Sequence, residues 1–397
     1  MTREEIYTQC LEKVGNCRCL MMELATGTGK TKMAIDLINH LSTTLYEGKK
    51  TKMLLLVAKR VHKQTWKEEF EKWGGIKVDE VVMECYESLK NHTRESFTFV
   101  ILDEVHHVKS EARRQLLKTI KYDYMLGLSA TIPKKLMQYL VYNYHAQVVK
   151  CSITEAIEDA VLPEPEILLL PLELNNTMPT ETWEINAKVK GPVLRGTYRD
   201  RWKLKKQKVH AIISMTQKQK LMEFDSLIQW EKERYMRTRN VIAERSWLYH
   251  CGERLRFLSD CKVSIVKYIL KRLEKERTIT FCKTIEQCEE LGSNCIHSKN
   301  ADSSKLYEQF NQKKIDHITA VNILNENANL VDCKYAVFTN LSSSEVVSAQ
   351  RVGRSLRHKH PTIIIPYYKD TREEEIAKKM IEDYNKDFIK TINISQI

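Results

Sequence analysis

Continuous runs of apolar residues alternate along the chain with segments in which apolar residues recur at helical spacing. The run from Cys19 to Leu24 is followed by a turn of small residues, after which helical spacing begins near Met33 and continues to Ile38. This order predicts a strand, a loop and an amphipathic helix. Another continuous apolar run ends at Asp103. Such a run is typical of a strand that is buried on both faces of a parallel sheet.

The same alternation returns in the second half of the chain. Strands are expected near Ile318–Ile323, Ala336–Phe338 and Thr362–Ile365, with helical segments between them. Strands that alternate with helices predict an α/β fold. We therefore expect one lobe over residues 1–174 and a second over 255–397. The intervening residues 175–254 follow a Pro-containing linker and have long helical spacing, so we expect a basic helical insert there.

The charge of the chain is concentrated in this insert. The 397 residues carry a net charge of +12, and the segment from Lys188 to Lys220 holds eleven Lys or Arg against one acid, a net +10. Tyr198 and Trp202 lie among these basic residues. Basic residues interleaved with aromatic ones suit a nucleic-acid backbone and its exposed bases. Arg201 and Trp202 are therefore candidate contacts, and the alternative is a solvated helical face.

Several classes of protein are disfavoured by the composition. No apolar run approaches the ~20 residues that span a bilayer, and the N-terminal segment MTREEIYTQC is polar. The 11 cysteines are scattered without a C-x-x-C pair, which argues for reduced thiols and against structural zinc. We expect a cytoplasmic protein that does not contact a membrane, and nothing in the sequence requires it to be more than a monomer.

The turn after the first apolar run has the composition of a phosphate-binding loop. Glycines let backbone N–H groups curl around a phosphate, and the helix that follows directs its positive end there. Lys30 is expected to reach the β- and γ-phosphates of a nucleotide, and Thr31 to ligate Mg²⁺. Leu24 replaces the first glycine of the strict motif, so a chance turn is the alternative, but the strand–loop–helix context favours the phosphate site. The candidate loop residues are Thr26, Gly27, Thr28, Gly29, Lys30 and Thr31.

Two acidic residues end the apolar run FTFVILDE. In open α/β sheets, active residues lie at the carboxyl ends of strands. A carboxylate at Asp103 can hold the Mg²⁺ of a nucleotide, and Glu104 can orient and activate the attacking water. A solvated acidic turn is the alternative, and the phosphate loop upstream makes it less favourable.

Four motifs in order identify a resemblance to a known family. The segments ATGTGKT (25–31), DEVHH (103–107), GLSATIP (127–133) and QRVGRSLRH (350–358) resemble those of the superfamily 2 helicases and translocases of the DExH type. Within that superfamily the chain is most similar to the XPB-like, phage UvsW-like and type I restriction motor branch. The resemblance implies two RecA-like lobes that bind ATP and Mg²⁺ and act on nucleic acid, with DNA favoured over RNA.

The resemblance also implies roles for individual residues. Asp103 is implied to coordinate the Mg²⁺ shell and Glu104 to be the catalytic base. His106 is implied to couple the acidic box to the second lobe, and Ser129 and Thr131 to link hydrolysis to movement.

The arginines of QRVGRSLRH divide into two groups. In a helix of 3.6 residues per turn, Gln350, Arg354 and Arg357 point to nearly one side, whereas Arg351 points away. This geometry and the family pattern favour Arg354 and Arg357 as catalytic residues that reach the γ-phosphate from the second lobe, with Gln350 beside them. The alternative is a solvated basic helix, which the apolar strand directly after it disfavours.

Further candidates follow from the family alone. Lys59 and Arg60 come after a predicted strand whose end touches the nucleic-acid backbone in the family. Tyr86 resembles a residue of the next nucleic-acid motif, although a buried tyrosine is the alternative. Gln9 is the nearest candidate for an adenine-reading glutamine.

The predicted activity is ATP-dependent translocation along nucleic acid or its unwinding. The alternatives are an RNA helicase, a duplex translocase that remodels branched DNA, and a nucleic-acid-binding scaffold with a decayed motor.

Overall fold

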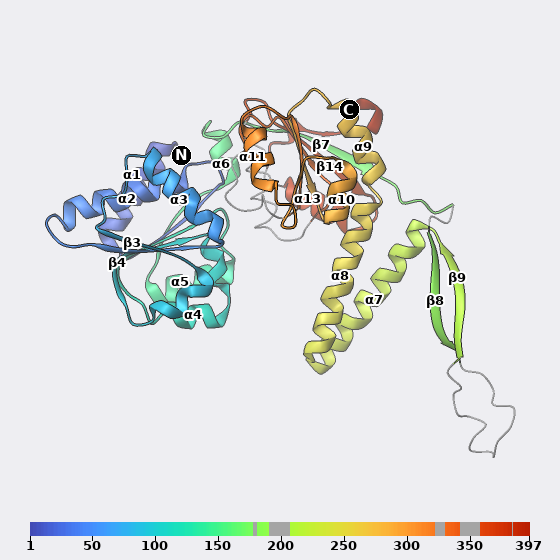
Figure 1. The fold of residues 1–397 in the computed structure, drawn as a ribbon, viewed down its shortest axis with the longest axis horizontal. Helices are drawn as coiled ribbons and strands as arrows, with labels where there is room; N and C mark the ends of the chain where they lie inside the picture. The colour runs from blue at the N-terminus through green and yellow to red at the C-terminus, as the bar shows by residue number, and fades with distance from the viewer. Residues whose placement is uncertain (178–180, 190–206, 322–329, 342–357, 383) are drawn as a thin grey trace, which may run out of the picture.

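Two parallel sheets, each covered by helices, form the two lobes of the molecule (Figure 1). The computed structural model describes the chain except for residues 178–180, 190–206, 322–329, 342–357 and 383. The predicted α/β architecture is confirmed. In the described part of the chain, no helix combines the length and the apolar character needed to cross a membrane.

The first lobe contains a six-stranded sheet in which all paired strands are parallel. The strand order is β3-β2-β4-β5-β1-β6. The strands are β1 (Cys19–Leu24), β2 (Lys52–Val57), β3 (Glu80–Cys85), β4 (Ser96–Asp103), β5 (Lys121–Ser129) and β6 (Gln147–Cys151). The helices are α1 (Arg3–Asn16), α2 (Lys30–Leu45), α3 (Arg60–Lys72), α4 (Glu111–Leu117) and α5 (Lys134–Tyr144), with 3₁₀ turns η1 (Tyr86–His92) and η2 (Val105–Lys109).

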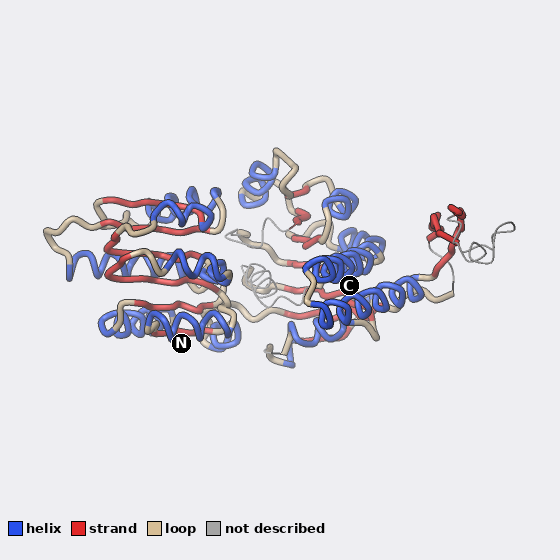
Figure 2. The backbone as a smooth tube through the Cα atoms, turned by 90° about the horizontal axis from the view of Figure 1, so that it is seen from below, coloured by secondary structure: helices blue, strands red, loops and turns tan. Residues whose placement is uncertain are grey.

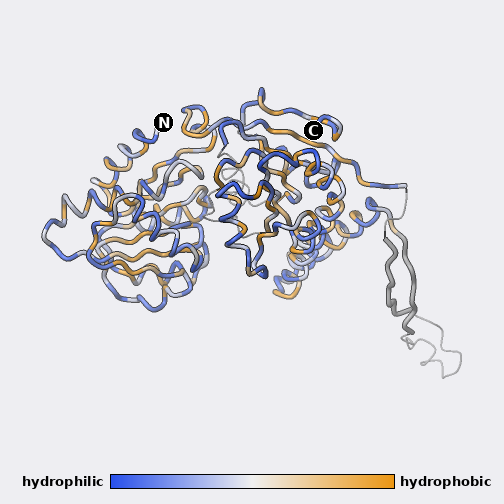
Figure 3. The backbone as a smooth tube through the Cα atoms, turned by 45° about the horizontal axis from the view of Figure 1, so that its top comes forward, coloured by the Kyte–Doolittle hydropathy of each residue, from blue (hydrophilic) through white to orange (hydrophobic). Residues whose placement is uncertain are grey.

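Helices cover both faces of this sheet, which explains why its strands are continuously apolar. Leu20 and Met22 of β1 pack with α1, α2 and α3 on one face. Met21, between them, packs with α4 and α5 on the other face. Successive side chains of a strand point to opposite faces, so both must be apolar when both faces are buried. Figures 2 and 3 show the layers and the hydrophobic strands inside them.

The second lobe contains a seven-stranded sheet of order β11-β12-β10-β13-β14-β7-β15, again with parallel pairing. Its strands are β7 (Glu166–Leu172), β10 (Thr278–Cys282), β11 (Cys295–Ile296), β12 (His317–Val321), β13 (Tyr335–Phe338), β14 (Thr362–Tyr368) and β15 (Ile389–Thr391). The helices of this part of the chain are α6 (Ile153–Glu158), α9 (Val263–Arg272), α10 (Ile285–Leu291), α11 (Ser303–Asn311) and α13 (Arg372–Met380), with 3₁₀ turns η4 (Lys386–Phe388) and η5 (Ile394–Gln396). The three strands predicted from the sequence correspond to β12, β13 and β14.

The predicted lobe boundary at residue 174 is corrected by the sheet pairing. Strand β7 lies between β14 and β15 in the second sheet, although residues 1–174 were assigned to the first lobe. An apolar run predicts a buried strand but carries no information about which sheet it joins. The change of lobe therefore occurs between β6 and β7.

The insert is not wholly helical, which corrects a second expectation. Strands β8 (Glu181–Val189) and β9 (Gln207–Met215) pair antiparallel, and they precede the hairpin of α7 (Gln217–Thr238) and α8 (Val241–Asp260). The alternation of Trp183, Ile185 and Ala187 with polar residues is the period of a strand, and the charge of the segment obscured it. Helix α8 also continues past the predicted boundary at residue 254.

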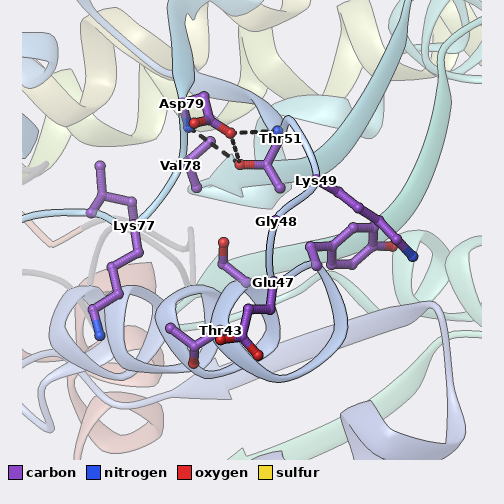
Figure 4. Close-up of a pocket in the computed structure, with 11 residues that line it drawn as sticks. Thr43, Glu47, Gly48, Lys49, Thr51, Lys77, Val78 and Asp79 are labelled. Carbon is purple, nitrogen blue, oxygen red and sulfur yellow. Dashed lines mark hydrogen bonds between the residues drawn. The ribbon is translucent and has the colours of Figure 1, made fainter.

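A small hollow of about 440 Å³ lies beside the end of α2, lined by side chains that include Thr43, Glu47 and Lys77 (Figure 4). At its edge, the Asp79 carboxylate accepts hydrogen bonds from the backbone N–H and the hydroxyl of Thr51, at 2.7 and 3.0 Å. These bonds lower the pKa of Asp79 and fasten the chain at the starts of β2 and β3. The phosphate loop lies at the opposite end of α2, so the hollow is separate from it.

Candidate functional site

The predicted phosphate loop joins the carboxyl end of β1 to the first turn of α2. Gly27 and Gly29 have φ values of 101° and 98°, in the region that glycine occupies without steric cost. Gly29 is also the N-cap of α2. The Lys30 ammonium lies against the loop and donates to the Leu24 carbonyl at 2.9 Å. The strand, loop and helix predicted here are all present.

A cavity of about 760 Å³ opens over this loop. Its volume is within the range of small-molecule sites, which measure about 300–1,000 Å³. It is lined by the loop residues Thr26, Gly27, Thr28, Gly29, Lys30 and Thr31, by Asp103 and Glu104, and by side chains of α1 and α3. The structure therefore brings the predicted phosphate loop and the predicted acidic pair to one cavity.

The register of the parallel strands brings these residues together. Asp103 of β4 is paired with Leu128 of β5, and Glu23 of β1 is paired with Ser129. The carboxyl ends of β1, β4 and β5 thus lie at one edge of the sheet. The Glu23 carboxylate also accepts a hydrogen bond from the Ile132 N–H at 2.8 Å, which fixes the loop after β5 at the same edge.

The Asp103 carboxylate is buried and is held by an indole. Its Oδ2 accepts a hydrogen bond from Nε1 of Trp66 at 2.9 Å. The exposed fractions of Asp103 and Trp66 are 6% and 2%. Helix α3 supplies this donor from the face of the sheet that also carries α1 and α2. Because the hydrogen bond fixes the rotamer of the carboxylate, Asp103 is already positioned at the cavity.

Tyr86 supports the same residue from the other face of the sheet. Its hydroxyl donates to the Asp103 carbonyl at 2.9 Å, and its ring stacks on His107 with centroids 5.6 Å apart. Tyr86 is 1% exposed, and burial raises its pKa well above the usual value. The prediction that Tyr86 contacts nucleic acid is therefore wrong, because the side chain is enclosed by the first lobe.

Glu104 is the centre of a second polar cluster. Its Oε2 lies 3.3 Å from Nδ1 of His106 and accepts from the Ser129 hydroxyl at 3.3 Å. Ser129 Oγ is in turn 3.1 Å from Nδ1 of His106 and 2.8 Å from the Thr131 carbonyl. The three residues for which a coupling role was predicted therefore form one hydrogen-bonded cluster around Glu104.

The backbone of Glu104 is also unusual. It has φ 52° and ψ 59°, the left-handed region, which costs a residue with a Cβ about 1–2 kcal/mol. Such conformations concentrate at functional sites, where the surrounding structure enforces them. Here the conformation separates the Asp103 and Glu104 carboxylates, so that one bonds to Trp66 and the other to the His106–Ser129 cluster.

Several predicted residues are not placed by the structure. Gln350, Arg354, Arg357, Arg201 and Trp202 lie outside the described residues. Their assignments stay predictions.

Other predicted residues are placed, with different outcomes. Lys59 and Arg60 are exposed and follow the carboxyl end of β2, at the same edge of the sheet as Asp103. Gln9 does not line the cavity, and its amide contacts Sδ of Met1 at 3.0 Å. The role of Gln9 in reading adenine stays a prediction. Helix α1 instead presents Arg3 and Tyr7 to the cavity.

Sequence reasoning missed the donor to Asp103. Trp66 lies on the apolar spacing of α3, and this spacing alone indicates a core residue. It is buried, but its Nε1 bonds to the site. A buried indole must place its N–H on an acceptor, and this requirement is the signal that could have directed attention to a nearby carboxylate.

Two family models match the chain. The model of the type III restriction enzyme, res subunit, matches residues 3–134, and the helicase conserved C-terminal domain matches residues 261–359. A search of curated proteins gave no match.

The fold is similar to that of solved helicase structures. The helicase domain of Hef from Pyrococcus furiosus is 13% identical, with a TM-score of 0.51 over 95% of this chain and 97% of that one. Dbp5 from S. cerevisiae, bound to RNA and ADP BeF3, is 11% identical, with a TM-score of 0.58 over 96% and 86%. These likenesses confirm the fold with two RecA-like lobes. One family model falls within the first lobe and the other within the second.

Replacing Trp66 with Phe tests the indole–carboxylate contact. The Trp66→Phe variant leaves the buried Asp103 carboxylate without this donor, so the free energy of unfolding of the first lobe should fall by about 1–3 kcal/mol. Urea unfolding followed by circular dichroism measures the change. The matched control is Trp73→Phe. This variant removes the hydrogen bond that the Trp73 indole, which is 37% exposed, donates to the Glu69 carboxylate. It should cost about 0.5 kcal/mol or less. Equal losses in the two variants would contradict the role of Trp66.

Proposed function

We propose that the chain is an ATP-dependent nucleic-acid helicase or translocase of the DExH type. The observation that carries this proposal is the convergence of the phosphate loop, Asp103, Glu104 and the Ser129 cluster at one edge of a parallel sheet. A second RecA-like lobe, which such a motor needs to close over its nucleotide, is present in the same chain.

The residues around the cavity fit a nucleotide with Mg²⁺. The positive-φ glycines leave room for phosphate oxygens, and Lys30 lies beside them. Thr31 and Asp103 supply hydroxyl and carboxylate oxygens, the ligands that Mg²⁺ prefers. When bound, Mg²⁺ neutralises charge on the phosphates during phosphoryl transfer. Lys30 and the loop N–H groups bind and orient the phosphates, and the fixed rotamer of Asp103 keeps its carboxylate turned toward the cavity.

Glu104 is the proposed general base. Glu104 lines the cavity, although only 5% of its surface is exposed. A carboxylate in this position can accept the proton of an attacking water. His106 and Ser129 hold its Oε2, and Ser129 continues to Thr131. A shift of the loop after β5 would thus move the base, which provides a physical route by which hydrolysis and movement are linked.

The nucleic-acid side of the proposal rests on exposed basic and aromatic residues. Lys59 and Arg60 are exposed at the edge of the first sheet. In the insert, Trp230 of α7 and Tyr249 of α8 are 53% and 62% exposed, which suits the stacking of bases. The segment Lys188–Lys220, with its net +10, leads into this hairpin and ends in the first turn of α7.

DNA is the favoured substrate because the chain resembles the XPB-like, UvsW-like and type I restriction motor branch, to which the segment ITEAIEDAVLPEPEILLLPLEL (153–174) is similar. The likeness to a Dbp5 structure that contains RNA favours the second candidate, an RNA helicase. The two candidates share the ATP site and differ only in the nucleic acid that stimulates ATP hydrolysis.

The rate of ATP hydrolysis with different nucleic acids tests this proposal. We expect phosphate release to rise severalfold or more with the preferred substrate among single-stranded DNA, duplex DNA, branched DNA and RNA. All should be compared at one salt concentration, because affinity for nucleic acid falls steeply with salt. The Lys30→Ala variant should be inactive, and Lys49→Ala, in the turn that follows α2, should match the wild type. If no nucleic acid raised the rate, the motor proposal would fail.

The arginines of the second lobe provide a separate test. Arg354→Ala should lower kcat by roughly 10³-fold or more, because an arginine that reaches the transferred phosphoryl group stabilises its transition state. Arg351→Ala is the matched control, since Arg351 is predicted to point away from Arg354, and it should retain kcat within a few-fold. Unchanged turnover in folded Arg354→Ala protein would refute the assignment.

A further inference from the structure

An ion pair is completely buried at the carboxyl end of the second sheet. Lys262, the N-cap of α9, places its Nζ 2.6 Å from Oε1 of Glu373, in the first turn of α13. The side chains are 0% and 2% exposed. Removing two charges from water is costly unless the remaining donors and acceptors are also satisfied. The surroundings of this pair meet that requirement.

The pair is part of a network that converges on the end of β13. Lys262 Nζ donates to the Thr339 carbonyl at 3.0 Å, and the Ser259 hydroxyl donates to the same carbonyl at 3.1 Å. The Thr339 hydroxyl is 2.9 Å from Oε1 of Gln287, and Gln287 Nε2 donates to the Ser259 carbonyl at 2.7 Å. The Glu373 Oε2 accepts from the backbone N–H of the last residue of β14 at 3.2 Å.

These residues join the insert hairpin to the sheet. Ser259 lies in the last turn of α8, and Lys262 comes directly after that helix. Thr339 directly follows β13. In the sequence, Gln350 follows Thr339 by eleven residues. The network thus fixes the end of α8 to the strand end from which the chain leaves toward the proposed catalytic arginines.

We propose that Lys262 and Glu373 are positioning residues that couple the α7–α8 hairpin to the carboxyl edge of the second sheet. This inference rests on the function proposed above. A force on the hairpin from bound nucleic acid is transmitted through α8 to Ser259 and Lys262, and from there to the Thr339 carbonyl. Nucleic acid thereby alters the rate of the chemical step.

A charged pair suits this role better than an apolar contact. Apolar side chains tolerate small sliding movements, whereas a buried ammonium must keep its acceptors within hydrogen-bond distance. Lys262 has partners on α13 and at the end of β13, so the same ammonium group holds both elements at a fixed distance from α9. The buried polar network favours one arrangement of the helices at this edge over others of similar packing.

The test compares nucleic-acid stimulation in a double variant with that in the wild type. In Lys262→Met, Glu373→Met both charges are removed, and such replacements of a buried pair often leave stability unchanged or increased. We expect this variant to fold and to keep its KM for ATP within about twofold, because the phosphate loop belongs to the first sheet. Its kcat at saturating nucleic acid should fall at least tenfold. A merely structural pair would not produce this difference between KM and kcat.

The matched control is at the opposite end of the same strand. Lys334 precedes β13 and pairs with Glu276 at 2.9 Å, so Lys334→Met, Glu276→Gln also removes a pair of charges beside β13. It should keep wild-type stimulation. Thermal unfolding of each variant establishes that it is folded. If the double variant at residues 262 and 373 does not fold, Ser259→Ala serves instead, and it should lower stimulated kcat about threefold or more without a change in KM.

The outcomes separate this inference from the proposed function. A folded double variant with wild-type stimulation would overturn the coupling role of the pair and leave the motor proposal intact. If the double variant does not fold, wild-type stimulation in Ser259→Ala would overturn the coupling role and leave the motor proposal intact. A wild-type protein that no nucleic acid stimulates would overturn both. Loss of stimulation in the residue 334 control as well would show a general effect of charge removal, which also contradicts the specific role of Lys262 and Glu373.

Discussion

The parallel register of β1, β4 and β5 is the constraint on which the candidate site depends. It aligns Glu23 with Ser129 and Asp103 with Leu128, so the three strands end at one edge. One cavity is therefore surrounded by the phosphate loop, the acidic pair and the loop after β5. A shift of one residue in any of these strands would turn its side chains to the opposite face and disperse the site.

Around this edge, the two faces of the sheet contribute different supports. Helix α3 supplies Trp66 to the Asp103 carboxylate, and the 3₁₀ turn after β3 supplies Tyr86 to the Asp103 carbonyl. The left-handed backbone of Glu104 then directs the neighbouring carboxylate to His106 and Ser129. Two adjacent acids thus acquire separate environments, as expected if one holds a metal ion and the other moves a proton.

The sequence was informative where a local pattern determines local structure. Continuous apolar runs identified the buried strands, and the glycines and Lys30 identified the loop between β1 and α2. It was uninformative where the answer depends on distant parts of the chain. The spacing that places Trp66 in a core does not reveal that its indole meets Asp103, and an apolar run such as β7 does not reveal which sheet it joins. Likewise, the sequence does not reveal that the rotation of α1 presents Tyr7 to the cavity.

The central claim is that Glu104 activates the water that attacks a nucleotide held by the phosphate loop. Single-turnover cleavage of ATP by the Glu104→Gln variant, with Mg²⁺ and saturating nucleic acid, tests it most directly. The variant should bind ATP with near wild-type affinity, because Lys30 and the loop are intact, and cleavage should slow by about 10²–10⁴-fold, the usual contribution of a general base. Cleavage of bound ATP at the wild-type rate would refute the role of Glu104, because the water would then be activated by another group.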